Sequence, residues 1–159
     1  MSGPPLSVRD YRCLVGQEVC VGEWTLIDQA MIDRFAELTG DRQFIHLDPE
    51  RARRTPFGAT IAHAFLVLSL LGGVGTEALP QIEDMAFGLN YGFERVRFTA
   101  PVRAGRRVRA RFTLSAVDER SPGQLISTLA VTVEIEGEDK PALVADWLVL
   151  AVVRPGRQA

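Results

Sequence analysis

The segment from Thr60 to Leu71 constrains the possible folds of this chain more than any other part of the sequence. Its run IAHAFLVLSLL (residues 61–71) predicts a helix with apolar side chains on every side. A helix of that kind must be enclosed by other structure. The run contains a histidine and is shorter than the roughly 20 apolar residues that span a bilayer. The sequence therefore predicts a central buried helix, and no membrane-spanning one.

The second half of the chain predicts strands that can enclose this helix. Segments 107–116 and 128–136 alternate between apolar and polar residues, which is typical of strands with one buried face. Segment 143–153 is apolar on both faces except at Asp146, so it predicts an interior strand of the sheet.

One further segment, 85–93, also alternates, and its phase has changed by Val96, so we expect a β-bulge near Tyr91 and Gly92. A long antiparallel sheet must cover its apolar face, and the central helix is the element available to cover it. The sequence thus predicts an α+β protein with a hot-dog fold, in which an antiparallel sheet wraps around a buried central helix.

Capping and stop signals divide the first half of the chain. The run GGVG after Leu71 is expected to end the central helix. The other expected elements are a strand at 18–27, a helix from the N-cap Asp28 to Leu38 with Gly40 as its stop, a short helix from Pro49 to Arg54 with Asp48 as its N-cap, and frayed segments at both termini.

Length and composition indicate one ordinary globular domain, residues 1–159, with its core at about 18–153. The net charge of −2 gives no reason to expect a nucleic-acid partner. Cys13 and Cys20 form no metal-binding or redox motif, and we expect two free, buried thiols in a reducing compartment. The first residues lack the pattern of a signal peptide, so a cytoplasmic protein is expected.

Asp41 and His46 are the candidate catalytic pair. They lie five residues apart in a segment without helical or strand period, and such a loop can direct both side chains to one point. A carboxylate and an imidazole can then share a water molecule, one accepting its proton while the other delivers a proton to a substrate. The spacing alone is also common in loops, where it means a capping Asp and a surface His.

His63, at the start of the central helix, is the only other histidine, and we expect a core histidine with satisfied hydrogen bonds there more than a catalytic one. Together with Asp41, His46 and Asp48 it could be imagined as a metal site, but no pair has the i, i+4 spacing of helical metal ligands, so no metal or other cofactor is expected. The first N–H groups of this helix lack intrahelical partners and lie at its positive end. Near His63 and Ala64 they could form an oxyanion hole for a thioester carbonyl.

These residues carry a resemblance to a known family. Gly40-Asp41, Ile45-His46, Asp48-Pro49 and Ile61-Ala62-His63 follow one another within residues 35–71, and GLNYGFERVRFTAPVRAGRRVRARF follows at 88–112. In both stretches the sequence resembles the MaoC-like dehydratases, which include the (R)-specific enoyl-CoA hydratases. It is most similar to the branch that contains nodulation protein N. The resemblance extends from about Glu18 to Val153.

The resemblance implies addition of water to a trans-2-enoyl-CoA to give the (R)-3-hydroxyacyl-CoA. Asp41 and His46 then correspond to the pair that activates water, and the backbone N–H of Ala64 corresponds to the oxyanion hole. Pantetheine would follow a groove in a homodimer, with the acyl chain beside the central helix. The substrate contacts that we expect are Gln43, Phe57, Gly58, Ile61, His63, Asn90 and Tyr91.

Three positions depart from the family pattern. Ala64 stands where glycine is usual, which keeps the N–H but adds a methyl group. Gln43 and Phe44 replace an Asn-Pro pair, as is typical of the nodulation protein N branch. A helix serine of some hydratases falls at Gly72.

Two other functions remain open at this point. A hot-dog thioesterase usually carries its carboxylate on the central helix, and residues 60–71 contain none. A non-catalytic acyl-CoA-binding protein would not need the pair Asp41 and His46. Candidate contacts for the CoA phosphate are Arg95, Arg97, Arg103, Arg106 and Arg107, although each is as readily explained as a solvated residue.

Overall fold

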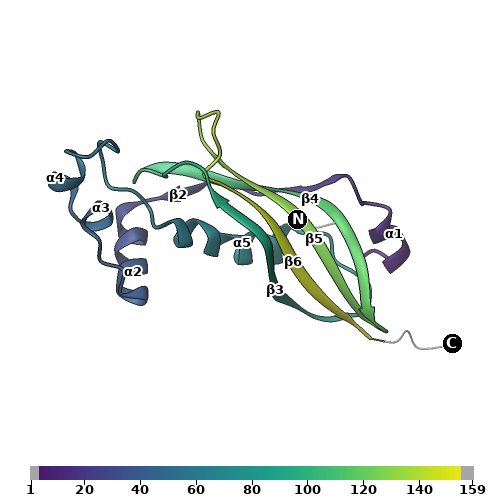
Figure 1. Cartoon of the computed structure of the whole chain (residues 1–159). Helices are drawn as coiled ribbons and strands as arrows, with labels where there is room; N and C mark the ends of the chain where they lie inside the picture. Colours follow the sequence, from purple (N-terminus) through teal and green to yellow (C-terminus); the bar gives the residue numbers. More distant parts are fainter. Residues whose placement is uncertain (1–3, 155–159) are drawn as a thin grey trace.

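The structure is a computed structural model that describes residues 4–154, without the side chains of residues 76–78. It is dominated by one antiparallel sheet with strand order β1-β4-β5-β6-β3, in which β2 pairs with a second part of β4 (Figure 1). The strands are β1 (Glu18–Val21), β2 (Thr25–Ile27), β3 (Met85–Phe98), β4 (Arg106–Ser121), β5 (Gln124–Ile135) and β6 (Leu143–Val153). The helices are α1 (Val8–Arg12), α2 (Gln29–Thr39), α3 (Phe44–Leu47), α4 (Pro49–Ala52) and α5 (Ala64–Ala78).

Helix α5 lies along the inner face of the curved sheet, which confirms the predicted architecture (Figure 1). Its buried residues Leu66, Val67 and Leu71 belong to the same core cluster as Phe112 of β4 and Leu129 of β5. On β5 every second residue is buried, so the alternation that the sequence showed corresponds to the face covering the helix. As predicted, β6 is interior, with β5 on one side and β3 on the other.

The bounds of α5 differ from the predicted ones. The helix begins at Ala64 because residues 60–63 are extended and pair with a neighbouring loop, where Ala62 N–H donates to the Val102 carbonyl at 2.7 Å. It also continues through GGVG to Ala78. Gly75 serves close packing there and does not end the helix, since a Cβ at this position would lie 2.6 Å from the Trp147 ring.

One side of α5 is not enclosed within a single chain, contrary to the prediction of a fully covered helix. Phe65 is 66% exposed, and Ser69 and Gly73 are exposed as well. Strand β3 forms an edge of the sheet and exposes Phe87 and Leu89. Apolar surface is thus left open on both the helix and the adjoining edge strand.

Other predicted boundaries need smaller corrections. The strand predicted at 18–27 is interrupted at residues 22–24, where Gly22 packs so closely that a Cβ would meet Val74 at 2.7 Å. The N-terminal segment is ordered where it is described, because Tyr11 of α1 is buried and its hydroxyl bonds to Ser127. Cys13 is exposed and Cys20 is only partly buried, so the expectation of two buried thiols is wrong. The predicted fraying of residues 155–159 lies outside the described part.

The helix caps predicted in the first half of the chain are confirmed. Asp28 accepts a hydrogen bond from Met31 N–H at 2.8 Å, and Gly40 ends α2 with a left-handed backbone at φ 78°. Asp48 caps α4, which ends at Ala52 and not at Arg54. The short helix α3 was not predicted.

The bulge expected near Tyr91 and Gly92 is confirmed by a register shift between Asn90 and Gly92. Among the described residues, no helix is both long and apolar enough to cross a membrane.

Candidate active site

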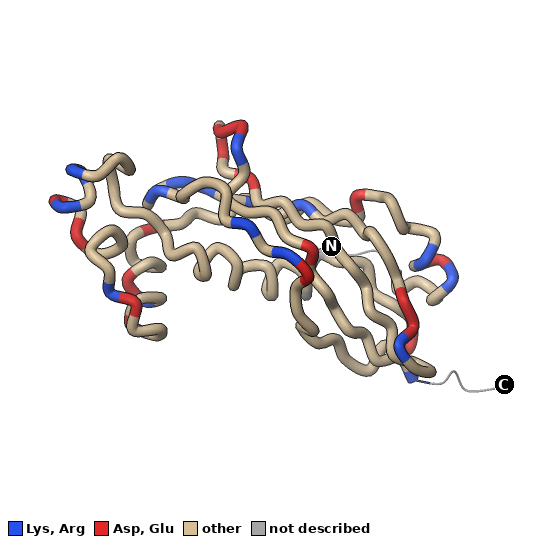
Figure 2. Tube along the Cα trace, in the orientation of Figure 1, with Lys and Arg blue, Asp and Glu red and all other residues tan. Residues whose placement is uncertain are grey.

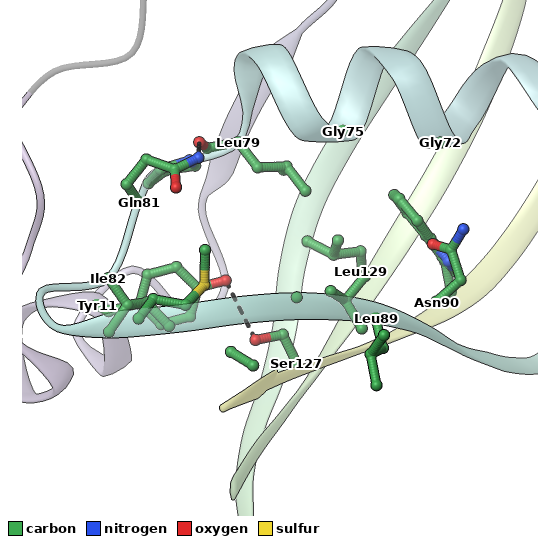
Figure 3. A pocket seen from close by; sticks show the side chains of 16 residues that line it. Tyr11, Gly72, Gly75, Leu79, Gln81, Ile82, Leu89, Asn90, Ser127 and Leu129 are labelled. Atoms are coloured by element: carbon green, nitrogen blue, oxygen red, sulfur yellow. Dashed lines mark hydrogen bonds between the residues drawn. The ribbon is translucent and has the colours of Figure 1, made fainter. Parts of the chain in front are cut away.

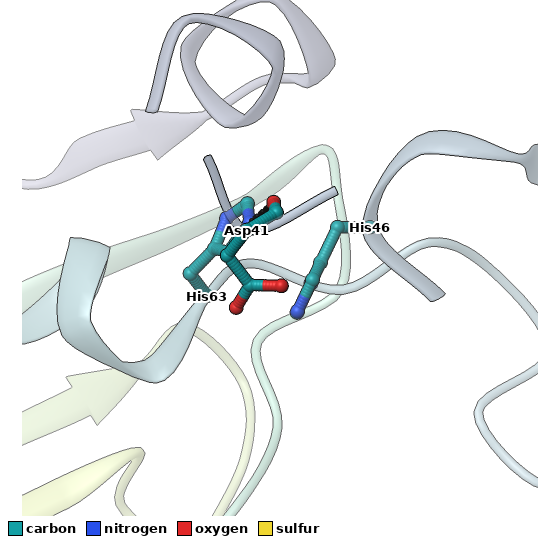
Figure 4. Close-up of side chains that lie close together, drawn as sticks. All are labelled: Asp41, His46 and His63. Atoms are coloured by element: carbon teal, nitrogen blue, oxygen red, sulfur yellow. Dashed lines mark hydrogen bonds between the residues drawn. The ribbon is translucent and has the colours of Figure 1, made fainter. Parts of the chain in front are cut away.

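Three polar side chains, Asp41, His46 and His63, meet at the first turn of α5. Asp41 follows Gly40 at the end of α2, His46 lies on α3, and His63 is the N-cap residue of α5. One potential proton-accepting atom from each residue lies within 4.8 Å of those from the other two. Figure 4 shows the Asp41 carboxylate and the His46 ring directed toward the same space. The structure therefore brings the predicted pair together and adds His63 to it.

The surroundings of His46 define which of its ring nitrogens faces the site. Its side chain is buried, at 6% exposure, and Nδ1 lies 2.7 Å from the carbonyl oxygen of Ile61. Since a carbonyl oxygen can only accept, Nδ1 carries the proton and Nε2 is left with a free lone pair in the neutral ring. Burial lowers the pKa of His46, and neighbouring His63 lowers it further, while the Ile61 hydrogen bond and Asp41 oppose the shift. His46 is therefore poised as a neutral proton acceptor.

Gln29 holds the segments that carry these groups. Its amide nitrogen donates to the His46 carbonyl at 2.8 Å and to Asp33 at the same distance. Its amide oxygen accepts from the Thr60 hydroxyl at 2.6 Å. One side chain thus ties α2 to α3 and to the extended segment before α5. The role of Gln29 was not predicted, because a glutamine after a capping residue carries no signal for a contact seventeen residues away.

His63 contacts both members of the predicted pair. Its Nε2 lies 2.9 Å from the backbone carbonyl oxygen of Asp41, and its ring stacks on the His46 ring with a centroid distance of 3.8 Å. Phe35 packs against the same imidazole at 5.1 Å. The His63 side chain is only 2% exposed, and its Nδ1 has no hydrogen-bond partner among the described residues.

A pocket of about 390 Å³ opens beside these side chains. Its walls are mostly apolar, and three of its polar lining residues, Asp41, His46 and His63, lie together. The backbone N–H of Ala64, the first residue of α5, meets no acceptor among the described residues. The lining comprises Asp41, Ile45, His46, residues 61–65, Val67, residues 98–102 and Ala142. Sequence reasoning did not assign residues 98–102 to the site, since this turn is distant in the chain and carries no titratable group.

The same cluster was tested as a metal site. The lone pair of a neutral imidazole lies in the ring plane, and a metal ion sits about 2.0–2.1 Å from the nitrogen. The His46 and His63 rings are 3.8 Å apart and inclined by only 24°. An ion in the plane of one ring therefore lies outside the plane of the other. This geometry disfavours ligation of one ion by both rings.

The other predicted substrate contacts lie at different places. Ile61 and His63 line the pocket, whereas Gln43 is exposed ahead of α3 and Gly58 is exposed in the loop before α5. Phe57, in the same loop, is half-buried and its carbonyl accepts from Arg103 at 2.7 Å.

Asn90 and Tyr91 lie on the edge strand β3, outside the lining of the pocket that holds Asp41. Within one chain the site is therefore assembled from fewer residues than expected.

A second pocket, of about 260 Å³, follows the later turns of α5. Figure 3 shows Gly72 and Gly75 on the side of the helix that borders it, with Asn90 across from them. The hydrogen-bonded pair Tyr11 and Ser127, with 3.1 Å between the hydroxyl oxygens, closes its far end. Small residues on the helix thus leave space between α5 and the sheet.

Most candidate phosphate-binding arginines already have a carboxylate partner. Arg107 pairs with Glu136, Arg106 with Glu138 and Arg95 with Asp146. The arginines of these pairs lie on β3 and β4, whereas Glu136 and Glu138 follow the end of β5. The first turns of α5 carry no charge (Figure 2).

Among the described residues, no carboxylate lies within ion-pair distance of Arg97 or Arg103. Arg103 directly follows Val102, which lines the pocket. Arg97 directly precedes Phe98, which also lines the pocket, so these two arginines are the candidates best placed beside it.

Comparison with known proteins now decides the family. The model of the MaoC like domain matches residues 12–137, which is well over half of the chain. The chain belongs to the MaoC-like family. Among MaoC-like relatives, nodulation protein N of Rhizobium leguminosarum bv. viciae is 49% identical over 151 residues, or 94% of each chain. The 3-hydroxyacyl-thioester dehydratase Z of Mycobacterium tuberculosis is 43% identical over 143 residues, covering 90% of this chain and 94% of the relative.

The solved structure of the (R)-hydratase from A. caviae gives a MaoC-like comparison in three dimensions. It matches with a TM-score of 0.71 and 29% identity, over 85% of this chain and 94% of the other. The resemblance read from the sequence and the hot-dog fold are both confirmed. The MaoC-like family includes hydratases and dehydratases, so the chain belongs to a family of lyases.

Proposed function

We propose that this MaoC-like protein adds water to a trans-2-enoyl-CoA and releases the (R)-3-hydroxyacyl-CoA. The observation that carries this proposal is the convergence of Asp41 and His46 on one apolar pocket that also contains the free N–H of Ala64. Two relatives support it by their names, a 3-hydroxyacyl-thioester dehydratase and an (R)-specific enoyl-CoA hydratase. The reverse reaction, loss of water, uses the same groups.

The proposed chemistry needs one water held between two acceptors. Two hydrogen bonds of about 2.6–3.2 Å can meet at a single water oxygen when the acceptors are up to about 6 Å apart. A carboxylate oxygen of Asp41 and a ring nitrogen of His46 lie within 4.8 Å, and both groups face the same space (Figure 4), so one water can reach both. One group takes a proton from the water as its oxygen bonds to the β-carbon. The protonated group then delivers this proton to the α-carbon, which completes the addition and returns both side chains to their starting state.

The negative charge that develops on the thioester oxygen would be stabilised at the head of α5. In this proposal the carbonyl accepts from the Ala64 N–H, which lies at the positive end of the helix. The acyl chain would extend along α5, toward the pocket bordered by Gly72 and Gly75. The remaining expected contacts, Gln43, Phe57, Gly58, Asn90 and Tyr91, stay predictions for the bound thioester.

A thioesterase is the second candidate for the same pocket. It would direct water to the thioester carbonyl, with a carboxylate on the central helix. The helical residues that line the pocket, Ala64, Phe65 and Val67, offer none. A non-catalytic acyl-CoA-binding protein would not require the lowered pKa of His46 or its free Nε2. The hydratase therefore agrees best with the arrangement of groups.

We also propose that the protein acts as a homodimer. Phe65 of α5 and the edge-strand residues Phe87, Leu89 and Phe93 are exposed apolar side chains. An unpaired strand edge flanked by apolar side chains favours pairing with a second chain. Such a dimer would place the open side of α5 near its partner and complete the pantetheine groove. Cytoplasmic location remains an expectation from the sequence.

The activity test uses crotonyl-CoA and longer enoyl-CoAs. Hydration removes the enoyl absorbance and leaves the thioester intact, so we expect absorbance to fall with no release of free thiol. Thiol release at the same rate would favour the thioesterase. Tight binding of acyl-CoA with neither change would favour the non-catalytic protein.

A further inference from the structure

His63 is a buried titratable side chain to which the proposed chemistry assigns no step. It lies at 2% exposure in the wall of the pocket, and the ring contacts both Asp41 and His46. Because the Asp41 carbonyl can only accept, the 2.9 Å contact fixes the proton of neutral His63 on Nε2. The lone pair of Nδ1 is then buried without a partner among the described residues.

This unpaired nitrogen argues against a role in stability alone. A buried acceptor that lacks a hydrogen bond destabilises the folded state. A phenylalanine or leucine would fill the same apolar space beside Phe35 without that cost. Besides packing against Phe35, the His63 imidazole contacts the backbone of one proposed catalytic residue and the ring of the other.

We propose that His63 is a positioning residue for both groups, holding the Asp41 backbone through Nε2–H and fixing the ring plane of His46 by stacking. The inference rests on the proposed function for its effect on rate, but its structural part stands independently. His46 is held at one edge by the Ile61 carbonyl, and that hydrogen bond alone leaves the ring free to tilt about it. The stacked His63 removes this freedom, so that Nε2 of His46 stays directed toward the Asp41 carboxylate.

Three substitutions separate the two contacts. His63→Gln keeps an amide N–H near the position of Nε2 but removes the stacked ring. His63→Phe keeps an aromatic face but removes the donor, and His63→Leu removes both. Displacement of a reacting group by about 1 Å can cost about 10²-fold in rate. We expect His63→Leu to lower kcat for crotonyl-CoA by about 10²-fold with little change in KM, and the other two variants each to recover part of the loss.

Nuclear magnetic resonance tests the same idea without reference to activity. The chain has two histidines, so their imidazole signals can be assigned with one variant. In the wild type we expect the Nδ1–H tautomer for His46 and the Nε2–H tautomer for His63. The ring-current shift of the His46 ring protons should disappear in His63→Gln and His63→Leu and persist in His63→Phe.

The results that would overturn the proposal are distinct from those that would overturn the activity. A folded His63→Leu protein that keeps kcat within about threefold of wild type contradicts it, as does the opposite tautomer for either histidine. An inactive wild type would refute the proposed function, while the tautomers and ring-current shifts would still decide whether His63 positions His46. An equal loss of kcat in His63→Gln, His63→Phe and His63→Leu would contradict the claim that the hydrogen bond and the stacking contribute separately.

Discussion

Removing either member of the Asp41 and His46 pair should remove most of the activity, and removing both should add little. The substitutions are Asp41→Asn and His46→Gln, which keep the size and polarity of each side chain. A carboxylate oxygen of Asp41 and a ring nitrogen of His46 lie within 4.8 Å, close enough to hold one water together. If both groups act on that water, the loss of either one stops the step that needs both, and the remaining group contributes little alone.

The expected magnitude follows from this shared water. A positioned acid–base group contributes about 10²–10⁴ in rate, and a 10²-fold loss corresponds to about 2.7 kcal/mol of transition-state free energy. Independent groups would lose about 10⁴-fold in the double mutant, or about 5.4 kcal/mol. Because Asp41 and His46 act as a unit, we expect each single variant to lose about 10²-fold or more and the double variant to be little worse than the poorer single.

The assay is kcat for crotonyl-CoA hydration, with acyl-CoA binding measured on the same variants. Binding should change much less than rate, since neither side chain is expected to hold the CoA. Asp118→Asn is the matched control, because Asp118 is exposed on β4 and lies outside the pocket lining. Folded Asp41→Asn and His46→Gln proteins with near wild-type rates would refute the mechanism, and a multiplicative loss in the double mutant would refute the shared water.

Four further outcomes are expected. Sedimentation at micromolar concentration should give a homodimer, and a stable, active monomer would contradict the interpretation of the exposed edge strand. An (S)-specific 3-hydroxyacyl-CoA dehydrogenase added to the reaction should oxidise none of the product, whereas rapid oxidation would mean that water attacks the opposite face of the double bond. Burial lowers the pKa of His46 and favours the neutral acceptor, so kcat/KM for hydration should fall only below about pH 6.5 and not at a higher pH. Gly72→Leu should fill the second pocket and lower kcat/KM for long enoyl-CoAs more than for crotonyl-CoA. The control Ala30→Leu, at an exposed position of α2 outside both pocket linings, should leave their ratio unchanged.

The overall architecture could be predicted because it depends on the regular spacing of apolar residues along the chain. Alternation along β4 and β5 marks the face that covers α5, and Asp28 and Gly40 mark the ends of α2. The bounds of α5 were not predictable in the same way. Its start is set by pairing of residues 60–63 with a distant loop, and its continuation depends on a close approach between Gly75 and Trp147.

The candidate site, too, could be predicted only in part from the sequence. Asp41 and His46 could be found because they are close in the sequence and match a family pattern. Gln29 and the turn at 98–102 reach the site through tertiary packing, so no local signal marks them. His63 was singled out by type and position, but its stacking on His46 and its unpaired nitrogen are visible only in three dimensions.

The most direct test of the central claim is the fate of oxygen-18 water during reaction with crotonyl-CoA. Mass spectrometry of the products reports which carbon the water oxygen has joined. We predict one oxygen-18 atom in the hydroxyl group of an intact 3-hydroxybutyryl-CoA, with incorporation slowed by about 10²-fold or more when Asp41→Asn is used under the same conditions. Label in a free carboxylic acid with release of CoA, or no incorporation by the folded wild type, would contradict the account.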